Sequence, residues 1–338
     1  MSDEQRLRRA NPSGETLVAG AVSGILYSSA VFGFAFLIPV QLVYGRRGKK
    51  SGLAAAGISF AFALLGQTLR DLLATPRADW AGLFGLGSML ALVLPPFLTL
   101  ALLALMNLSF WDSKNDLARG LAATALGSAF LVPALVAIER DQSFRGFLEE
   151  RLAAVAKTFL SGTGEGYEAS ALKAALDPQA LANTTFQVLN ASFAAFLFAF
   201  LAGSWWIGNR ASGAGSEGQR VSKALAEFRL PYAFVWPFLA AWAALLCATY
   251  FRLGEFASSA AWNLALVLTL AYAAQGLGLI SFLLKRWNMP RSLKVCFAVM
   301  AVVTVITPPV GTALLAILPI LGVTEVWIPY RKPKGVGA

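Results

Sequence analysis

Long runs of residues without a single charge recur along this whole chain, and they constrain its fold more than any other feature. About 20 apolar residues in an α-helix cross the hydrocarbon core of a bilayer. The runs are solidly apolar and do not alternate as the strands of a membrane β-barrel would. They therefore predict an all-α, polytopic integral membrane helix bundle of about eight spans. The runs are Thr16–Gly45, Leu53–Leu69, Trp80–Trp111, Gly120–Ile138, Phe186–Ile207, Pro231–Phe251, Phe256–Leu284 and Val295–Thr324.

The composition supports this class. Of the 338 residues, 57% are hydrophobic and 14% are charged, against roughly 45–50% and 25% in a soluble domain. The mean hydropathy is +0.63. The formal net charge of +10 fits basic loops that are retained in the cytoplasm and attracted to anionic lipid. We therefore expect membrane lipid as a partner and no nucleic acid.

The positions of the basic residues predict the orientation of the chain. Of the 28 lysines and arginines, 20 lie in six stretches that share one side of the predicted topology, and the side with more positive charge faces the cytoplasm. The N-terminus and most basic loops are therefore expected on the cytoplasmic side. These stretches are the residues before 16, Arg46–Lys50, Lys114–Arg119, Arg210–Arg229, Lys285–Lys294 and Arg331–Lys334.

Two runs, Thr16–Gly45 and Val295–Thr324, have basic residues on both flanks. A run with both flanks in the cytoplasm must turn back within the membrane, and 30 residues are few for two full spans. We expect a full helix plus a short one, or a re-entrant hairpin, turning near Pro39 and near Pro308-Pro309. The alternative is a proline-kinked helix that crosses once. The predicted fold therefore includes short or re-entrant helices near both ends.

The polar residues suggest a division of the chain. Residues 139–185 form the one sizeable segment outside the membrane, and the apolar residues of 141–160 recur at helical spacing, which predicts an amphipathic helix on the outer surface. We expect an N-terminal membrane bundle over 1–207 that includes this segment, a cytoplasmic linker over 208–230, and C-terminal membrane helices over 231–338.

Short motifs connect the chain to a known family. Phe228-Arg229-Leu230-Pro231 begins a span, Tyr272-Ala273-Ala274-Gln275-Gly276-Leu277 lies late in the next, and the last hairpin ends near Leu321-Gly322. In this order they resemble the YybS-like family of predicted bacterial membrane proteins, whose function is unknown. The family's usual acidic residue after the final Gly-Leu is replaced here by Val323-Thr324-Glu325. The resemblance implies a bacterial inner membrane.

The N-terminal part is also similar to the substrate-binding (S) subunits of energy-coupling-factor vitamin transporters. The motif Leu37-Ile38-Pro39 precedes a basic loop, and the small-residue helix Leu53–Leu65 follows. In those subunits a small-residue face on the first helix docks a coupling subunit. The resemblance thus implies that Gly20 and Gly24 dock a partner, with ordinary intramolecular packing as the alternative. Arg229, at the predicted cytoplasmic end of a span, is a third candidate for docking.

Amide side chains inside the predicted spans need hydrogen-bond partners. They are Gln67, Asn107, Gln187, Asn190, Asn263 and Gln275. Gln67, Asn190 and Gln275, together with the stacking ring of Trp236, are our candidates for binding a small polar ligand. The alternative is hydrogen bonding between helices, worth about 0.6–2 kcal/mol each.

The sequence offers little for catalysis. It contains no histidine, the commonest metal ligand and general base, and no acidic residue stands in the middle of a predicted span. Arg70-Asp71 and Glu139-Arg140-Asp141 look like local ion pairs at span ends. We expect no enzyme, no cofactor and no metal site.

Two functions remain. The first is a small-molecule binding or permease subunit that works with other membrane protein subunits, since the chain has no nucleotide-binding motif of its own. The second is a membrane scaffold or assembly subunit of an envelope or secretion complex, without transport or catalytic activity. A transporter subunit needs a cavity lined by residues such as Gln67, Asn190 or Gln275, whereas a scaffold can be packed solid.

Overall fold

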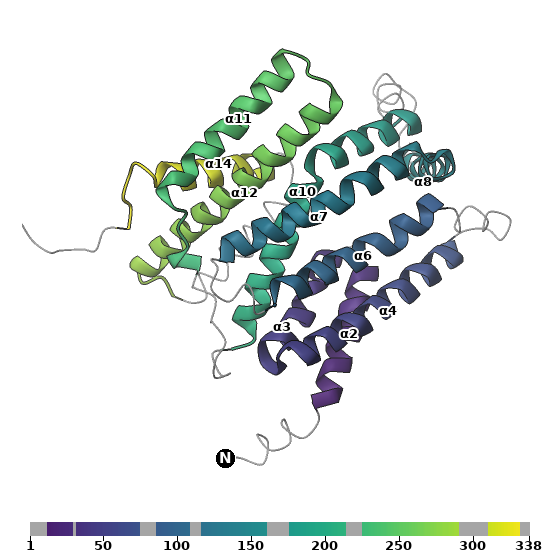
Figure 1. The fold of residues 1–338 in the computed structure, drawn as a ribbon, viewed down its shortest axis with the longest axis horizontal. Coiled ribbons are helices and arrows are strands. Elements are labelled where there is room, and N and C mark those ends of the chain that lie inside the picture. Colours follow the sequence, from purple (N-terminus) through teal and green to yellow (C-terminus); the bar gives the residue numbers. More distant parts are fainter. Residues whose placement is uncertain are drawn as a thin grey trace, which may run out of the picture. The chain divides into compact units, whose positions relative to one another are not determined.

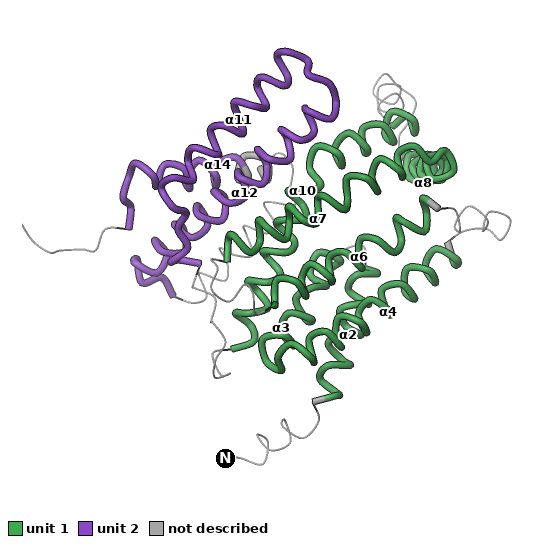
Figure 2. The backbone as a smooth tube through the Cα atoms, in the orientation of Figure 1, with its two compact units in different colours: residues 1–222 green, residues 223–338 purple. Residues whose placement is uncertain are grey.

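A computed structural model of the chain describes residues 12–29, 32–74, 86–108, 116–160, 176–213, 225–290 and 310–331. These residues form ten α-helices and short 3₁₀ turns, without a strand among them, which confirms the predicted all-α class (Figure 1). The chain separates into two compact units between Ser222 and Lys223 (Figure 2). This boundary lies inside the predicted linker 208–230.

Unit 1 contains seven of these helices. They are α2 (Pro12–Ser28), α3 (Leu37–Arg47), α4 (Lys49–Ala74), α6 (Leu86–Met106), α7 (Asp116–Arg140), α8 (Gln142–Leu160) and α10 (Pro178–Ala211). Unit 2 contains α11 (Val235–Tyr250), α12 (Glu255–Arg286) and α14 (Val310–Thr324).

Six helices in the described part of the chain are long and apolar enough to cross a membrane: α4, α6, α7, α10, α12 and the span that comprises α11. They coincide with six of the eight predicted runs. The other two runs do not appear among these six spans. The first is divided between α2 and α3, of 17 and 11 residues, and the last is described from Val310 onward. The predicted turn at Pro308-Pro309 lies outside the described residues.

The first run folds back on itself. The carboxylate of Glu15 in the first turn of α2 lies 2.7 Å from Nη2 of Arg47 in the last turn of α3. The two ends of the run therefore meet. The 3₁₀ turn Gly33–Ala35, rather than Pro39, lies between α2 and α3. Pro39 is the third residue of α3, where a missing N–H leaves no helical hydrogen bond unmade.

Glycines allow α2 and α4 to run side by side at close range. A Cβ atom on Gly20 would come within 2.8 Å of the Ala55 carbonyl oxygen, and one on Gly24 within 2.8 Å of the Ser59 carbonyl oxygen. The hydroxyls of Ser23 and Ser59, 2.6 Å apart, hydrogen-bond across the same contact. Small residues thus bring the two backbones together.

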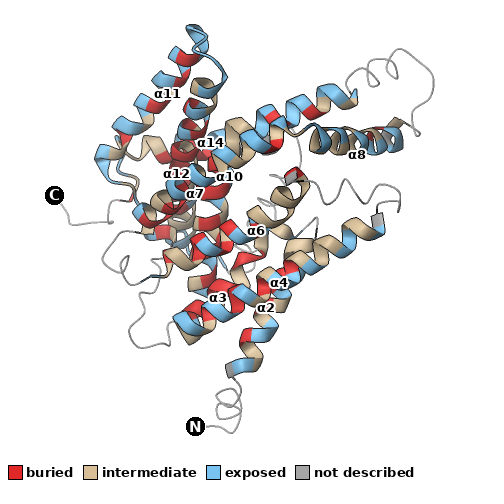
Figure 3. Ribbon diagram, turned by 45° about the vertical axis from the view of Figure 1, so that its right-hand side comes forward, coloured by how far each residue is buried: buried red, intermediate tan, exposed pale blue. Residues whose placement is uncertain are grey.

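Buried residues lie where helices face one another (Figure 3). Many of the exposed residues are large and apolar. The core of unit 1 joins α3, α4, α6, α7 and α10 around fully buried residues such as Leu37, Leu103 and Leu201. On the other side of the same helices, Leu65 and Phe196 are about two-thirds exposed. That arrangement is expected of helices with lipid as their outer solvent.

Unit 2 is built around α12, which packs against both α11 and α14. On α12, a Cβ on Gly276 would collide with the backbone of Leu318 on α14. In turn, a Cβ on Gly322 would collide with the backbone of Tyr272 on α12. The two glycines therefore make this crossing possible.

Candidate functional site

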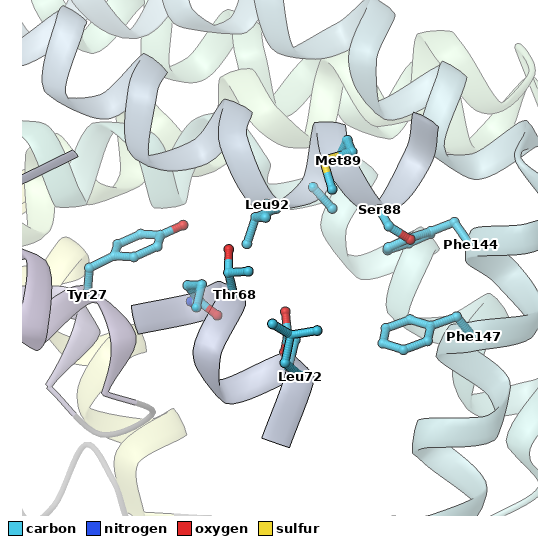
Figure 4. Close-up of a pocket in the computed structure, with 11 residues that line it drawn as sticks. Tyr27, Thr68, Leu72, Ser88, Met89, Leu92, Phe144 and Phe147 are labelled. Carbon is cyan, nitrogen blue, oxygen red and sulfur yellow. The ribbon is translucent and has the colours of Figure 1, made fainter. Parts of the chain in front are cut away.

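A cavity of about 160 Å³ lies inside unit 1, between α2, α4, α6 and α8 (Figure 4). Tyr27 stands at one end, and Phe144 and Phe147 of α8 stand at the other. This volume is close to that of an engineered cavity of roughly 150 Å³ that binds benzene in another protein. The cavity therefore has room for a molecule with one small ring.

The lining of this cavity is apolar with a few polar groups. Gln67 contributes an amide, Thr68 and Ser88 contribute hydroxyls, and Asp71 contributes a carboxylate. The described lining contains no lysine or arginine. A carboxylate in a lining without basic side chains favours ligands that donate hydrogen bonds or carry positive charge over anions.

Asp141 holds α8 in place at the cavity. One of its carboxylate oxygens accepts hydrogen bonds from the backbone N–H groups of Ser143, at 2.9 Å, and Phe144, which caps the start of α8. The other accepts from the backbone N–H of Gly87 in the first turn of α6, at 2.9 Å. These hydrogen bonds hold the pKa of Asp141 below its ordinary value, and the bond from Gly87 has the largest effect. One side chain thereby ties together the helices that carry Phe144 and Met89.

The predicted ion pairs at the span ends have other partners. Asp141 bonds backbone N–H groups as described, and the Glu139 carboxylate accepts a hydrogen bond from the Asn190 amide at 3.1 Å. Arg70 donates to the Ser28 carbonyl oxygen at 3.5 Å. Helix ends supply unpaired backbone groups, and adjacent residues on a helix do not face one another. The expectation of local ion pairs was therefore wrong for Asp141.

The candidate ligand residues do not form one group. In unit 1, Gln67 lines the cavity, whereas Asn190 bonds Glu139 and is not part of the lining. In unit 2, Trp236 lies on the outer face of α11 and is 67% exposed, while Gln275 is buried. Their proposed role in ligand binding stays a prediction.

Gln275 is the centre of a polar cluster in unit 2. Its Oε1 accepts from the backbone N–H of Leu230 at 2.9 Å, and its Nε2 lies 3.1 Å from both the Gly322 carbonyl oxygen and Oε2 of Glu325. This side chain therefore links α12 to the segments before α11 and after α14. Interhelical hydrogen bonding accounts for its burial.

Glu325 and Arg331 form a buried ion pair beside Gln275. Nε of Arg331 lies 2.8 Å from Oε1 of Glu325, and Nη2 lies 3.0 Å from Oε2. The Arg331 side chain is 2% exposed and that of Glu325 is 6% exposed. Nη1 of Arg331 also donates to the carbonyl oxygens of Ala226 and Phe228. The sequence analysis missed this pair. Its one signal was Glu325, an isolated acid directly after the last apolar run.

A second polar cluster that the sequence analysis missed lies in unit 1. Gln41, on α3, is fully buried. Its Nε2 donates to Asn209 on α10 at 2.8 Å and to Asn107 at 3.1 Å, and its Oε1 accepts from Asn107 at 2.7 Å. Gln41 lies in the first apolar run. A polar side chain within that run was the one sequence signal for a buried hydrogen-bonded cluster.

The candidate docking residues have different surroundings. Gly20 and Gly24 face α4 of the same chain, at the close crossing described above. This position is the one expected if they serve intramolecular packing. The Arg229 side chain is 57% exposed, and its Nε lies 3.7 Å from Oε1 of Glu325. Their docking of a partner stays a prediction.

Comparison with known proteins yields one family. Its sequence profile, described as "Predicted membrane protein (DUF2232)", matches residues 19–323. No curated protein and no solved structure matches the chain.

Proposed function

The chain belongs to the DUF2232 family of predicted membrane proteins, and on this premise we propose that it is a small-molecule binding or permease subunit that acts with partner membrane proteins. The observation that carries the proposal is the cavity of unit 1, where Gln67 faces a space bounded by apolar and hydroxyl side chains. Binding sites are commonly apolar hollows with a few placed polar groups. The similarity to energy-coupling-factor S subunits belongs to the same proposal.

The lining specifies the class of ligand. We propose a small, neutral or cationic molecule with one apolar ring or branch, because Asp71 is the charged group of the described lining. The aromatic rings of Phe144 and Phe147 would contact the apolar part. Gln67 and Thr68 would hydrogen-bond its polar part.

A thermal-shift experiment on the purified full chain tests this site. The probes are benzylamine, benzyl alcohol and benzoate, which share a ring and differ in charge. Ala91→Phe fills the cavity, and Ala101→Phe adds the same group to an exposed position of the same helix. We expect the amine and the alcohol to raise the Tm of the wild type and of Ala101→Phe, with no shift for Ala91→Phe. Equal shifts in all three proteins, or a preference for benzoate, would contradict the proposal.

The alternative is a membrane scaffold for an envelope or secretion complex. In its favour, the amides of Asn190 and Gln275 are bonded inside the chain. Extraction of the tagged protein in mild detergent, followed by mass spectrometry of the proteins that co-purify, separates the two functions. An ATPase pair with a coupling membrane subunit supports transport. Cell-wall or secretion proteins without an ATPase support the scaffold.

A further inference from the structure

Unit 2 contains a pocket of its own, of about 390 Å³, beside the buried ion pair. Its lining includes Arg229 and Tyr232 from the segment before α11, Gln275 from α12, and Glu325 and Arg331 from the segment after α14. This pocket therefore combines charged and polar groups from parts of the chain up to about 100 residues apart.

The charges at the inner side of this pocket are already matched. Each of the three guanidinium nitrogens of Arg331 lies within 3.4 Å of an acceptor, including both carboxylate oxygens of Glu325. The Glu325 carboxylate also accepts from Gln275. An ion pair supported by a charge-assisted hydrogen bond of this kind holds both side chains in fixed positions. These residues thus form a rigid polar wall with no net charge.

Arg229 adds one positive charge to that wall. Its side chain is more than half exposed, and within the described residues its one recorded polar contact is the 3.7 Å approach to Glu325, which is longer than a hydrogen bond. Among the described residues, most of its five N–H donors therefore have no acceptor, which leaves them for a ligand of the pocket. The formal charge of the pocket, with two arginines and one glutamate, is +1.

Exposed aromatic side chains near this pocket favour a position at the level of lipid headgroups. Tyr232, in the lining, is 63% exposed, and Trp327, two residues after Glu325, is 61% exposed. Exposed tyrosine and tryptophan are enriched where a membrane protein meets the interface. An arginine at this depth directs its guanidinium toward the headgroups.

We infer that this pocket is a binding site for a phosphate group, supplied by the headgroup of an anionic phospholipid, and that Arg229 is the residue that holds it. The planar guanidinium matches phosphate oxygens in pairs. The Tyr232 hydroxyl adds a donor, and the Glu325–Arg331 pair fixes the wall behind. This inference rests on unit 2 alone and is independent of the cavity in unit 1.

The test uses the full chain in a nonionic detergent, with binding followed by native mass spectrometry. The probes are diheptanoyl phosphatidylglycerol, diheptanoylglycerol, which lacks the phosphate, and inorganic phosphate. Arg229→Gln removes the proposed contact. Arg286→Gln removes an exposed positive charge at the end of α12, outside the pocket. Arg229→Lys keeps the charge and loses the paired geometry.

We expect Arg229→Gln to weaken phosphatidylglycerol binding by roughly tenfold or more and Arg229→Lys to weaken it less. Arg286→Gln should change binding by no more than about twofold, because salt screens an exposed surface charge. If inorganic phosphate binds and the phospholipid does not, and if that binding is lost in Arg229→Gln, the site belongs to free phosphate instead of lipid. Equal binding by the Arg229→Gln and Arg286→Gln variants, or equal binding of diheptanoylglycerol and the phospholipid, would overturn the inference.

Discussion

The buried polar clusters described in the two units differ in charge. The cluster of unit 1 consists of neutral amides, with Gln41 between Asn107 and Asn209. The cluster of unit 2 contains a full ion pair, Arg331 with Glu325. A neutral amide tolerates imperfect pairing, whereas an unpaired buried charge is far more costly. The comparison teaches that the segment after α14 must close on α12 for unit 2 to be stable.

Loss of the ion pair is expected to have the largest effect. Glu325→Ala leaves the Arg331 guanidinium buried without its counter-ion, and we expect a loss of about 3–5 kcal/mol in the free energy of unfolding. The measurement is SDS or thermal unfolding of the protein in detergent micelles. Glu255→Ala, at an exposed position in unit 2, is the control and should cost much less.

A double variant sharpens the same point. Replacing both Glu325 and Arg331 with methionine removes the charges together, and apolar residues of similar size often restore the stability of a buried pair. We expect the double variant to be more stable than Glu325→Ala. If it is equally unstable, the cost comes from lost packing and hydrogen bonds, and the contrast between the units is not one of charge.

Helix crossings give the next effect. Gly24→Ala in unit 1 and Gly276→Ala in unit 2 each place a methyl group against a neighbouring helix, and we expect each to cost about 1–3 kcal/mol. Gly57→Ala, on α4, meets open space and should be neutral or stabilise by up to about 1 kcal/mol. The same unfolding assay checks all three. A similar cost at Gly57 would show that backbone freedom, rather than helix contact, decides the outcome.

The neutral cluster of unit 1 should be easier to remove. Gln41→Leu leaves the amides of Asn107 and Asn209 without their shared partner, and we expect a loss of about 1–3 kcal/mol. Gln187→Leu, at an exposed position of α10, is the matched change and should be nearly silent. A loss at Gln41 as large as that of Glu325→Ala would abolish the proposed difference between the two units.

The smallest effect concerns Asp141 and depends on pH. Because the folded pKa of Asp141 lies below its ordinary value of 3.8, its contribution is complete above that value and is lost as the pH falls through the folded pKa. The Tm difference between the wild type and Asp141→Ala should therefore be present at pH 6 and shrink as the pH is lowered below about 4. Asp177→Ala, which removes the cap of α10, is the comparison at a site away from the cavity.

Local patterns and distant contacts were not equally predictable. The apolar runs indicated six of the long helices, and the basic flanks of the first run indicated that it folds back, as the Glu15–Arg47 contact shows. The position of the turn was wrong, because Pro39 is compatible with the start of a helix. The role of Asp141 was also wrong. Its partner Gly87 stands 54 residues away, and nothing in the local sequence identifies it.

The sequence by itself determined the class of the molecule and the positions of six of its long helices, because hydrophobicity acts over one turn or one span of chain. The tertiary structure decided which polar groups meet. Gln67 faces a cavity only because α8 returns to α6, and Gln275 meets Glu325 only across 50 residues of chain. Such contacts depend on how helices pack, and packing follows from the whole set of side-chain shapes at once.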